Sequence, residues 1–118
     1  MVIATQEEVE QFLSELHQKM KIRNIRYLNS RGKNTQTWFD LELSETDLDK
    51  HIERLSISNY SGCADGESMH GGTTMWVFGK IIKKHEIYIK ITIGDFNKAP
   101  ICISFHFSEE PMTYPYQI

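Results

Sequence analysis

The sequence has few cysteines and no long apolar run, and both absences narrow what the protein can be. Cys63 and Cys102 are the two cysteines among 118 residues, and neither has the CxxC or CxxH spacing of zinc ligands. Free thiols in a reducing compartment are favoured over a disulfide between them. No apolar run approaches the ~18 residues that span a bilayer, and the first residues lack the basic segment of a secretion signal. We expect a soluble, cytoplasmic protein without a membrane segment.

The motifs of several enzyme classes are also missing. The sequence contains no P-loop, GxGxxG, GxSxG or HExxH, so nucleotide hydrolysis, serine hydrolysis and zinc peptidase activity lack support. Cys63, His70 and His85 match no zinc spacing, and we expect neither a metal ion nor a cofactor. The length predicts a single domain over residues 1–118, large enough to bury a core without disulfides or metal.

Acidic residues are absent from one stretch of the chain, although the net charge is −3. The whole-chain charge argues against a general nucleic-acid binder. Residues 16–39, however, contain no acidic residue, and their charged side chains are Lys19, Lys21, Arg23, Arg26, Arg31 and Lys33. Arg31 and Lys33 flank a glycine, and they are candidates for contacts with RNA phosphates. A solvated polar turn is the alternative for this segment.

The first half of the chain has one strong helix signal. The capping box Thr5–Glu8 precedes apolar residues at helical spacing, which predicts a helix over residues 6–20. Two extended runs follow, at residues 21–28 and 35–43. The turn-rich segment 29–34 joins them, and this pattern predicts a β-hairpin.

The second half is dominated by strand patterns. Ser44 caps a second predicted helix, and residues 56–73 have four glycines and no clear period, which predicts a long loop. Three strand-like runs then follow at residues 75–82, 86–93 and 100–107, with connections too short for crossover helices. The predicted order is α-β-β-α-β-β-β. The fold class is α+β, an antiparallel sheet with both helices on one face and the other face open.

Alternation places polar side chains on that open face. Tyr88 and Lys90 alternate with isoleucines in the middle run, and Ser104 and His106 alternate with Ile103 and other apolar residues in the last run. We therefore expect the side chains of Tyr88, Lys90, Ser104 and His106 to share the face that the helices leave uncovered.

These side chains have the chemistry for phosphodiester cleavage without a metal. His106 can be a general acid or base near neutral pH, Tyr88 can donate a proton or stack on a base, and Lys90 can hold a phosphate. Strict alternation would turn Lys80 into the core, which is costly for an ammonium group. A β-bulge at Gly79 would return it to the open face, so we predict that bulge. Ordinary surface positions are the alternative for His106, Tyr88 and Lys90, and a regular strand with Lys80 on the core face is the alternative to the bulge.

Several short motifs, in order, resemble the MqsR family of bacterial toxins, which are mRNA endonucleases with a RelE-like fold. The motifs are Leu43-Ser44-Glu45-Thr46-Asp47, Met75-Trp76, Tyr88-Ile89-Lys90-Ile91-Thr92 and Ile103-Ser104-Phe105. They cover roughly residues 43–106.

The resemblance implies a metal-independent endoribonuclease, inhibited by a cognate antitoxin protein, in which the 2′-hydroxyl of mRNA attacks the adjacent phosphate. The strand tyrosine of the family falls on Tyr88 and its helix lysine on Lys50, an RNA-binding candidate. His106 stands where the family has a lysine. Val77 replaces a family glutamine and Asp49 a tyrosine, and these differences favour an alternative, a non-catalytic module of the same fold that binds a protein partner.

Overall fold

The computed structural model describes residues 2–64, 74–94 and 98–117. In these residues the helices are α1 (Gln6–Ile22), α2 (Gly32–Asp40) and α3 (Glu45–Glu53), with a short 3-10 helix, η1 (Ile57–Asn59). The strands are β1 (Arg26–Tyr27), β2 (Tyr60–Ala64), β3 (Met75–Ile82), β4 (His85–Thr92) and β5 (Ile101–Phe107). They form one sheet in the order β1-β5-β4-β3-β2. The α+β class is confirmed.

The sheet is mixed, which corrects the antiparallel prediction. β2, β3, β4 and β5 pair antiparallel with their neighbours, but β1 pairs parallel with β5 through Arg26 and Tyr27. The element order also differs from the predicted one, because a helix replaces the second predicted strand and β2 lies within the predicted loop. Within the described part of the chain, no helix is long and apolar enough to cross a membrane.

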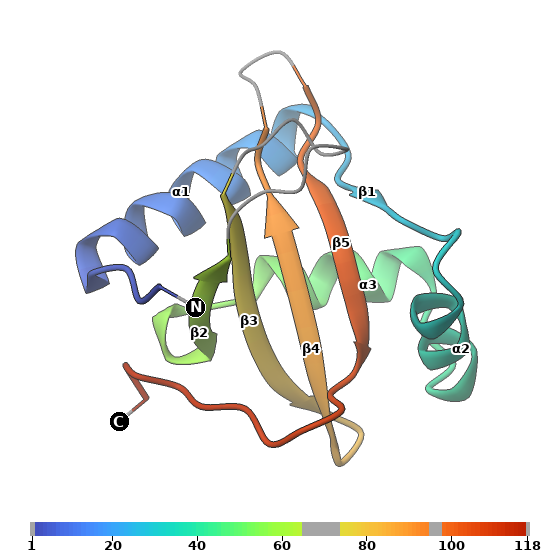
Figure 1. Cartoon of the computed structure of the whole chain (residues 1–118). Helices are drawn as coiled ribbons and strands as arrows, with labels where there is room; N and C mark the ends of the chain where they lie inside the picture. The colour runs from blue at the N-terminus through green and yellow to red at the C-terminus, as the bar shows by residue number, and fades with distance from the viewer. Residues whose placement is uncertain (1, 65–73, 95–97, 118) are drawn as a thin grey trace.

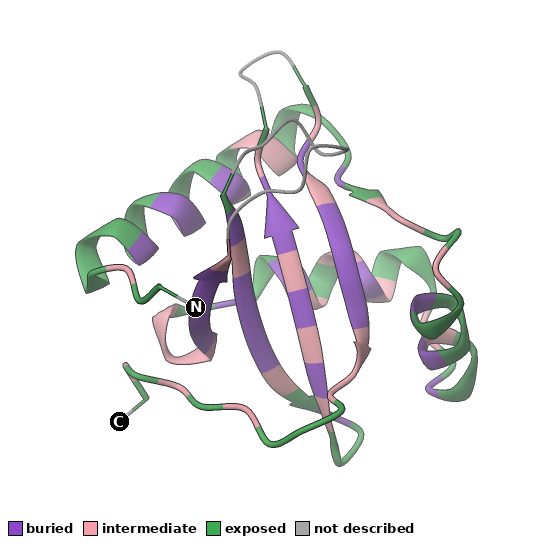
Figure 2. Cartoon of the chain, viewed as in Figure 1, coloured by how far each residue is buried: buried purple, intermediate pink, exposed green. Residues whose placement is uncertain are grey.

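Helices α1 and α3 cover one face of the sheet (Figure 1). Both begin at the predicted N-caps, Thr5 and Ser44, and both N-caps form capping boxes. Their apolar residues pack on the sheet residues that alternate inward, so burial switches along β4 from one residue to the next (Figure 2). The fully buried core contains Val9, Leu16, Ile52, Phe78, Ile87, Ile89, Ile91 and Phe105.

Helix α2 occupies the segment that the sequence analysis predicts as the strand 35–43. Phe39, Leu41 and Leu43 occupy alternate positions in this segment, a spacing typical of a strand, but it does not mark a buried face because Phe39 is 79% exposed. Asn34 and Thr37, which are three residues apart, instead lie on the buried face of α2 and contact the outer edge of β5. The Asn34 amide donates to the Ile103 carbonyl at 3.0 Å and accepts from the Phe105 N–H at 3.0 Å. Thr37 accepts from the Phe107 N–H, so α2 closes an edge that would otherwise be exposed.

Strand β2 and η1 lie in the first part of the predicted loop 56–73, which corrects that prediction for residues 57–64. Residues 65–73 lie outside the described part of the chain. Cys63 in β2 and Cys102 in β5 are both buried free thiols, in agreement with the favoured expectation.

The C-terminal segment 108–117 crosses the sheet face opposite α1 and α3 (Figure 1); we call it the strap. Glu86 of β4 anchors it, because its carboxylate accepts from the Met112 N–H at 3.0 Å and from the Tyr114 hydroxyl at 2.8 Å. The Ser61 hydroxyl donates to the Thr113 carbonyl at 2.7 Å. The face that the sequence analysis predicts to be open is therefore partly covered.

The predicted bulge at Gly79 is wrong. Gly79 pairs regularly with Tyr88, and Lys80 pairs with Ile87 on the helix-covered side. A Cβ at Gly79 would lie 2.4 Å from the Tyr114 hydroxyl oxygen and 2.6 Å from the Met112 sulfur. Glycine therefore fits this position because the strap passes directly over the strand, which is the close-approach role of a strand glycine.

Candidate functional site

Tyr88 and His106 form a cross-strand pair on the face away from α1 and α3. They are direct partners in the β4–β5 register, and their rings stack with centroids 5.4 Å apart and an interplanar angle of 15°. Lys90 pairs with Ser104 on the same face, one pair further along the strands. The predicted sharing of one face by these four residues is confirmed. Their exposure differs, however, since Ser104 is buried while the other three are half-buried.

A register shift limits how far the alternation of β5 extends. Lys90 pairs with Ser104 and the next residue, Ile91, pairs with Cys102, so Ile103 is an extra residue in β5. Cys102, which alternation assigns to the open face, consequently joins the core packed under the helices. The polar face is therefore continuous only from Ser104 to the C-terminal end of β5.

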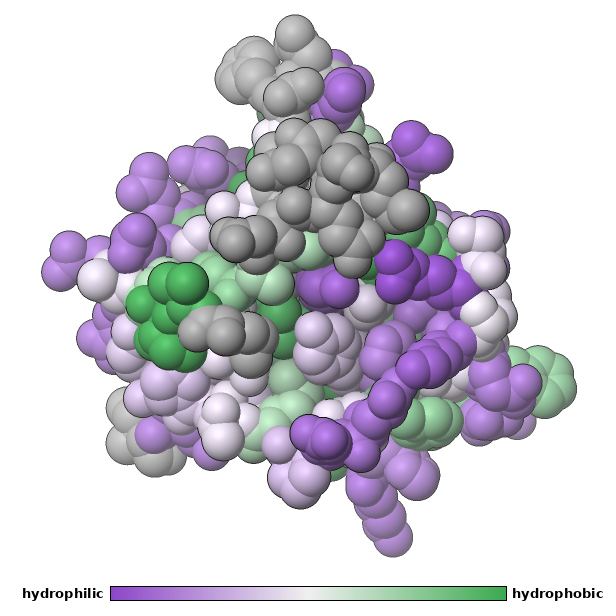
Figure 3. Space-filling model, in the orientation of Figure 1, coloured by the Kyte–Doolittle hydropathy of each residue, from purple (hydrophilic) through white to green (hydrophobic). Residues whose placement is uncertain are grey.

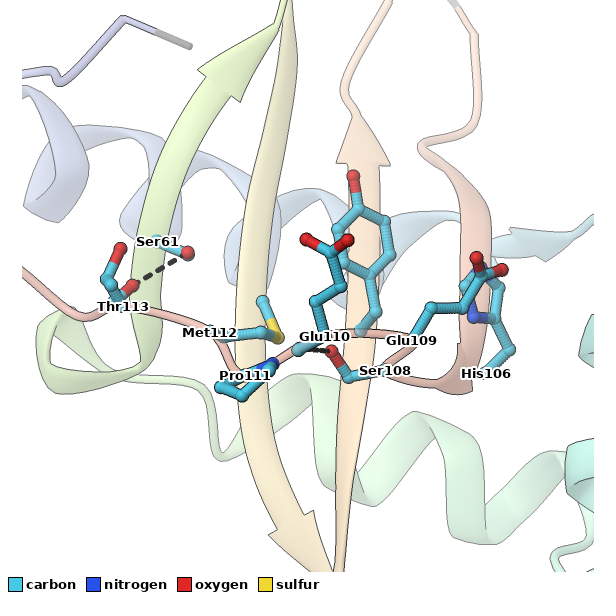
Figure 4. Close-up of a pocket in the computed structure, with 9 residues that line it drawn as sticks. Ser61, His106, Ser108, Glu109, Glu110, Pro111, Met112 and Thr113 are labelled. Atoms are coloured by element: carbon cyan, nitrogen blue, oxygen red, sulfur yellow. Dashed lines mark hydrogen bonds between the residues drawn. The ribbon is translucent and has the colours of Figure 1, made fainter.

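A cleft of about 420 Å³ opens beside the stacked pair (Figure 4). Tyr88 and His106 line it from the sheet, Ser61 lines it from β2, and strap residues 108–113 form its other wall. Figure 3 shows hydrophilic residues gathered over the lower right of this side of the molecule, around β5 and the strap. The site is thus built from sheet and strap together.

The hydrogen bond of His106 determines which nitrogen can react. Nδ1 lies 2.9 Å from the Phe107 carbonyl oxygen, which can only accept. Nδ1 therefore carries the proton, and Nε2 of the neutral ring is the nitrogen that can take up another one. The neutral imidazole is in this way prepared to act as a general base through Nε2.

Tyr88 is suited to the opposite role. Burial raises the pKa of its hydroxyl above the ordinary value, so the group keeps its proton at neutral pH. Tyr88 can therefore donate a proton or a hydrogen bond, but it cannot act as a base.

Two carboxylates of the strap, Glu109 and Glu110, also line the cleft. Glu109 forms an ion pair with Lys33 of α2, and both side chains are largely exposed, at 64% and 68%. The hydrogen bond and charge of Lys33, followed by the charge of His106, lower the pKa of the Glu109 carboxyl. Alternation in the strands could not reveal these residues. Gly79 was the one available signal, because a glycine within a strand indicates a segment passing close above it.

The predicted basic residues divide between the two sides of the sheet. Lys33 reaches the cleft through Glu109, and Arg31, half-buried, occupies the N-cap position of α2 without a side-chain capping hydrogen bond. Lys80 lies on the helix side, where burial and then the charge of Arg54 lower the pKa of its ammonium group. Lys50 is exposed in the last turn of α3, which packs on that same side. The structure therefore places Tyr88, Lys90 and His106 on one sheet face, and Lys33 is joined to the cleft wall through Glu109. Lys80 and Lys50 lie on the other side of the sheet.

Candidate metal ligands do not converge in the described ranges, where no group of three or more His, Cys, Asp or Glu side chains could hold an ion. His70 lies outside these ranges. Comparison with known proteins found no matching family model, no similar curated protein and no similar solved structure.

Proposed function

We propose that the protein is a metal-independent endoribonuclease whose catalytic centre is the Tyr88–His106 pair. The observation that carries the proposal is the stacking of an imidazole on a protonated phenol, at a cleft on the sheet face away from α1 and α3. A single-stranded nucleotide can reach this cleft, and its bases can stack on the aromatic rings.

The proposed reaction uses the 2′-hydroxyl of the RNA as the nucleophile. His106 Nε2 removes the proton of this hydroxyl, and the 2′-oxygen attacks the adjacent phosphorus. The bond from phosphorus to the 5′-oxygen then breaks, and the Tyr88 hydroxyl donates a proton to the leaving oxygen. The products are a 2′,3′-cyclic phosphate and a 5′-hydroxyl end, and proton exchange with water restores both side chains. Lys90 and Lys33 supply positive charge to the phosphate as its negative charge grows.

The resemblance to MqsR-family toxins supports a biological role for this chemistry. We propose that the substrate is mRNA, that a RelE-like architecture carries the site, and that a cognate antitoxin holds the protein inactive in a bacterial cytoplasm. The motif residues Tyr88 and Lys90 lie on the face that carries the proposed site.

Cleavage of a labelled single-stranded oligoribonucleotide in excess EDTA tests the proposal. His106→Ala should lower the single-turnover rate by ~10²–10⁴, the usual contribution of one acid–base group. His85→Ala is the matched control, because His85 is an exposed histidine at the start of β4 that does not line the cleft. Cleavage that requires magnesium, or that falls equally in both variants, would contradict the proposed chemistry.

A second candidate function, a non-catalytic module that binds a protein partner, is favoured by the acidic strap. Glu109 and Glu110 would repel a phosphate but attract a basic peptide segment. The position of Lys80 also favours this second function, because Lys80 lies on the helix side and cannot stabilise a phosphate in the cleft. Absence of RNA cleavage by the wild type under all metal conditions would select this reading.

A further inference from the structure

We infer that Glu109 restrains RNA binding at the cleft by occupying Lys33 in place of an RNA phosphate. The inference rests on the proposed function, and it assigns to the strap a regulatory role at the same site. A carboxylate on a lysine has the charge and the acceptor oxygens that a phosphodiester would present. The ion pair joins α2 to the strap beside His106. The strap therefore occupies the lysine that the substrate phosphate would contact.

The middle of the strap and the end beside the catalytic pair are held in different ways. Near its middle, the Met112 N–H and the Tyr114 hydroxyl both bond to Glu86, and the Thr113 carbonyl bonds to Ser61. This part also fills the space above Gly79. At the end beside the catalytic pair, the Ser108 N–H also donates to the Glu86 carbonyl at 2.9 Å. Glu109 itself, however, is linked to α2 through its exposed side chain, which pairs with Lys33. Glu109 can therefore leave Lys33 while the middle of the strap stays in place.

The strength of the contact suits an exchangeable restraint. Exposed ion pairs contribute little net stability and weaken with salt. A phosphate can therefore replace the carboxylate at small cost, after which Lys33 neutralises substrate charge. Glu109 then lowers RNA affinity in two ways, by competing for Lys33 and by repelling the phosphate, and only the first depends on Lys33.

Equilibrium binding of a fluorescent 2′-O-methyl oligoribonucleotide measures this restraint without cleavage, because the nucleophilic hydroxyl is blocked. Glu109→Gln should tighten binding about two- to five-fold, the size expected for an exposed pair. Glu110→Gln is the matched control, since it removes the same charge from the neighbouring residue in the same cleft wall. It should tighten binding less, through reduced repulsion alone.

A double-mutant cycle separates competition from repulsion. In a Lys33→Ala background, Glu109→Gln should have no larger effect than Glu110→Gln has there. Two results would overturn the inference while leaving the proposed function intact. One is an equal effect of the two glutamates in the wild-type background, and the other is a Glu109→Gln gain that still exceeds the Glu110→Gln gain in the Lys33→Ala background. Failure of every variant to bind RNA would refute the proposed function and this inference with it.

Discussion

The two faces of the sheet come from the same strands, yet they are organised in opposite ways. On the helix side, Ile87, Ile89 and Phe105 pack into a continuous apolar core under α1 and α3. On the other side, Tyr88 and His106 alternate with these residues and remain half-buried beside a cleft. One alternating pattern can therefore specify a core and a polar site together, because each residue of one face is flanked by residues of the other.

The largest expected effect compares neighbours on the two faces. Phe105→Ala should lower the free energy of unfolding by ~3–5 kcal/mol, because it removes a fully buried ring from the core. His106→Ala should cost only about 0.5–1.5 kcal/mol, the value of its aromatic contact with Tyr88. Urea unfolding of the two variants measures both. Comparable losses would mean that the polar face contributes as much to stability as the core.

A smaller effect is expected where the strap crosses the polar face. Gly79→Ala should destabilise the protein by ~1–3 kcal/mol, since the new methyl group would overlap the Tyr114 hydroxyl and the Met112 sulfur. Gly32→Ala at the start of α2 is the control, because a Cβ there meets nothing within 4 Å. Thermal unfolding should separate the two substitutions. An unchanged Tm for Gly79→Ala would show that the strap is not held against β3.

The smallest effect concerns two lysines on opposite sides. Lys90→Ala should weaken RNA binding several-fold and reduce the slope of log K against log salt by ~0.7, the loss of one phosphate contact on a single strand. Lys80→Ala should leave both quantities unchanged, because Lys80 faces the helix side. Titrations at several salt concentrations provide the measurement. A larger loss with Lys80→Ala would reverse the assignment of the two faces.

The helices and strands that could be predicted from the sequence are those marked by a capping residue or by alternation within a few residues. The capping boxes at Thr5 and Ser44 located two helices, and alternation in β4 correctly placed Tyr88 and Lys90 on one face. Alternation failed for α2, because its buried residues Asn34 and Thr37 form hydrogen bonds with the backbone of β5. Contacts with a distant strand leave no apolar period in the local sequence.

The candidate site was predictable in its strand residues and in Lys33, but not in the strap. Gly79 was interpreted as a bulge, whereas its small size accommodates the strap. The position of Glu109 depends on contacts between segments far apart in the chain, such as its pair with Lys33. Patterns within a short window cannot report contacts of this kind.

The central claim is that RNA binds the face of Tyr88 and His106 and not the face covered by α1 and α3. Backbone amide NMR shifts during titration with a 2′-O-methyl oligoribonucleotide test it most directly. The largest shifts should occur at Tyr88, Lys90, His106 and Lys33. Largest shifts in α3 around Lys50 and in β3 at Lys80, with the Tyr88–His106 pair unaffected, would contradict it.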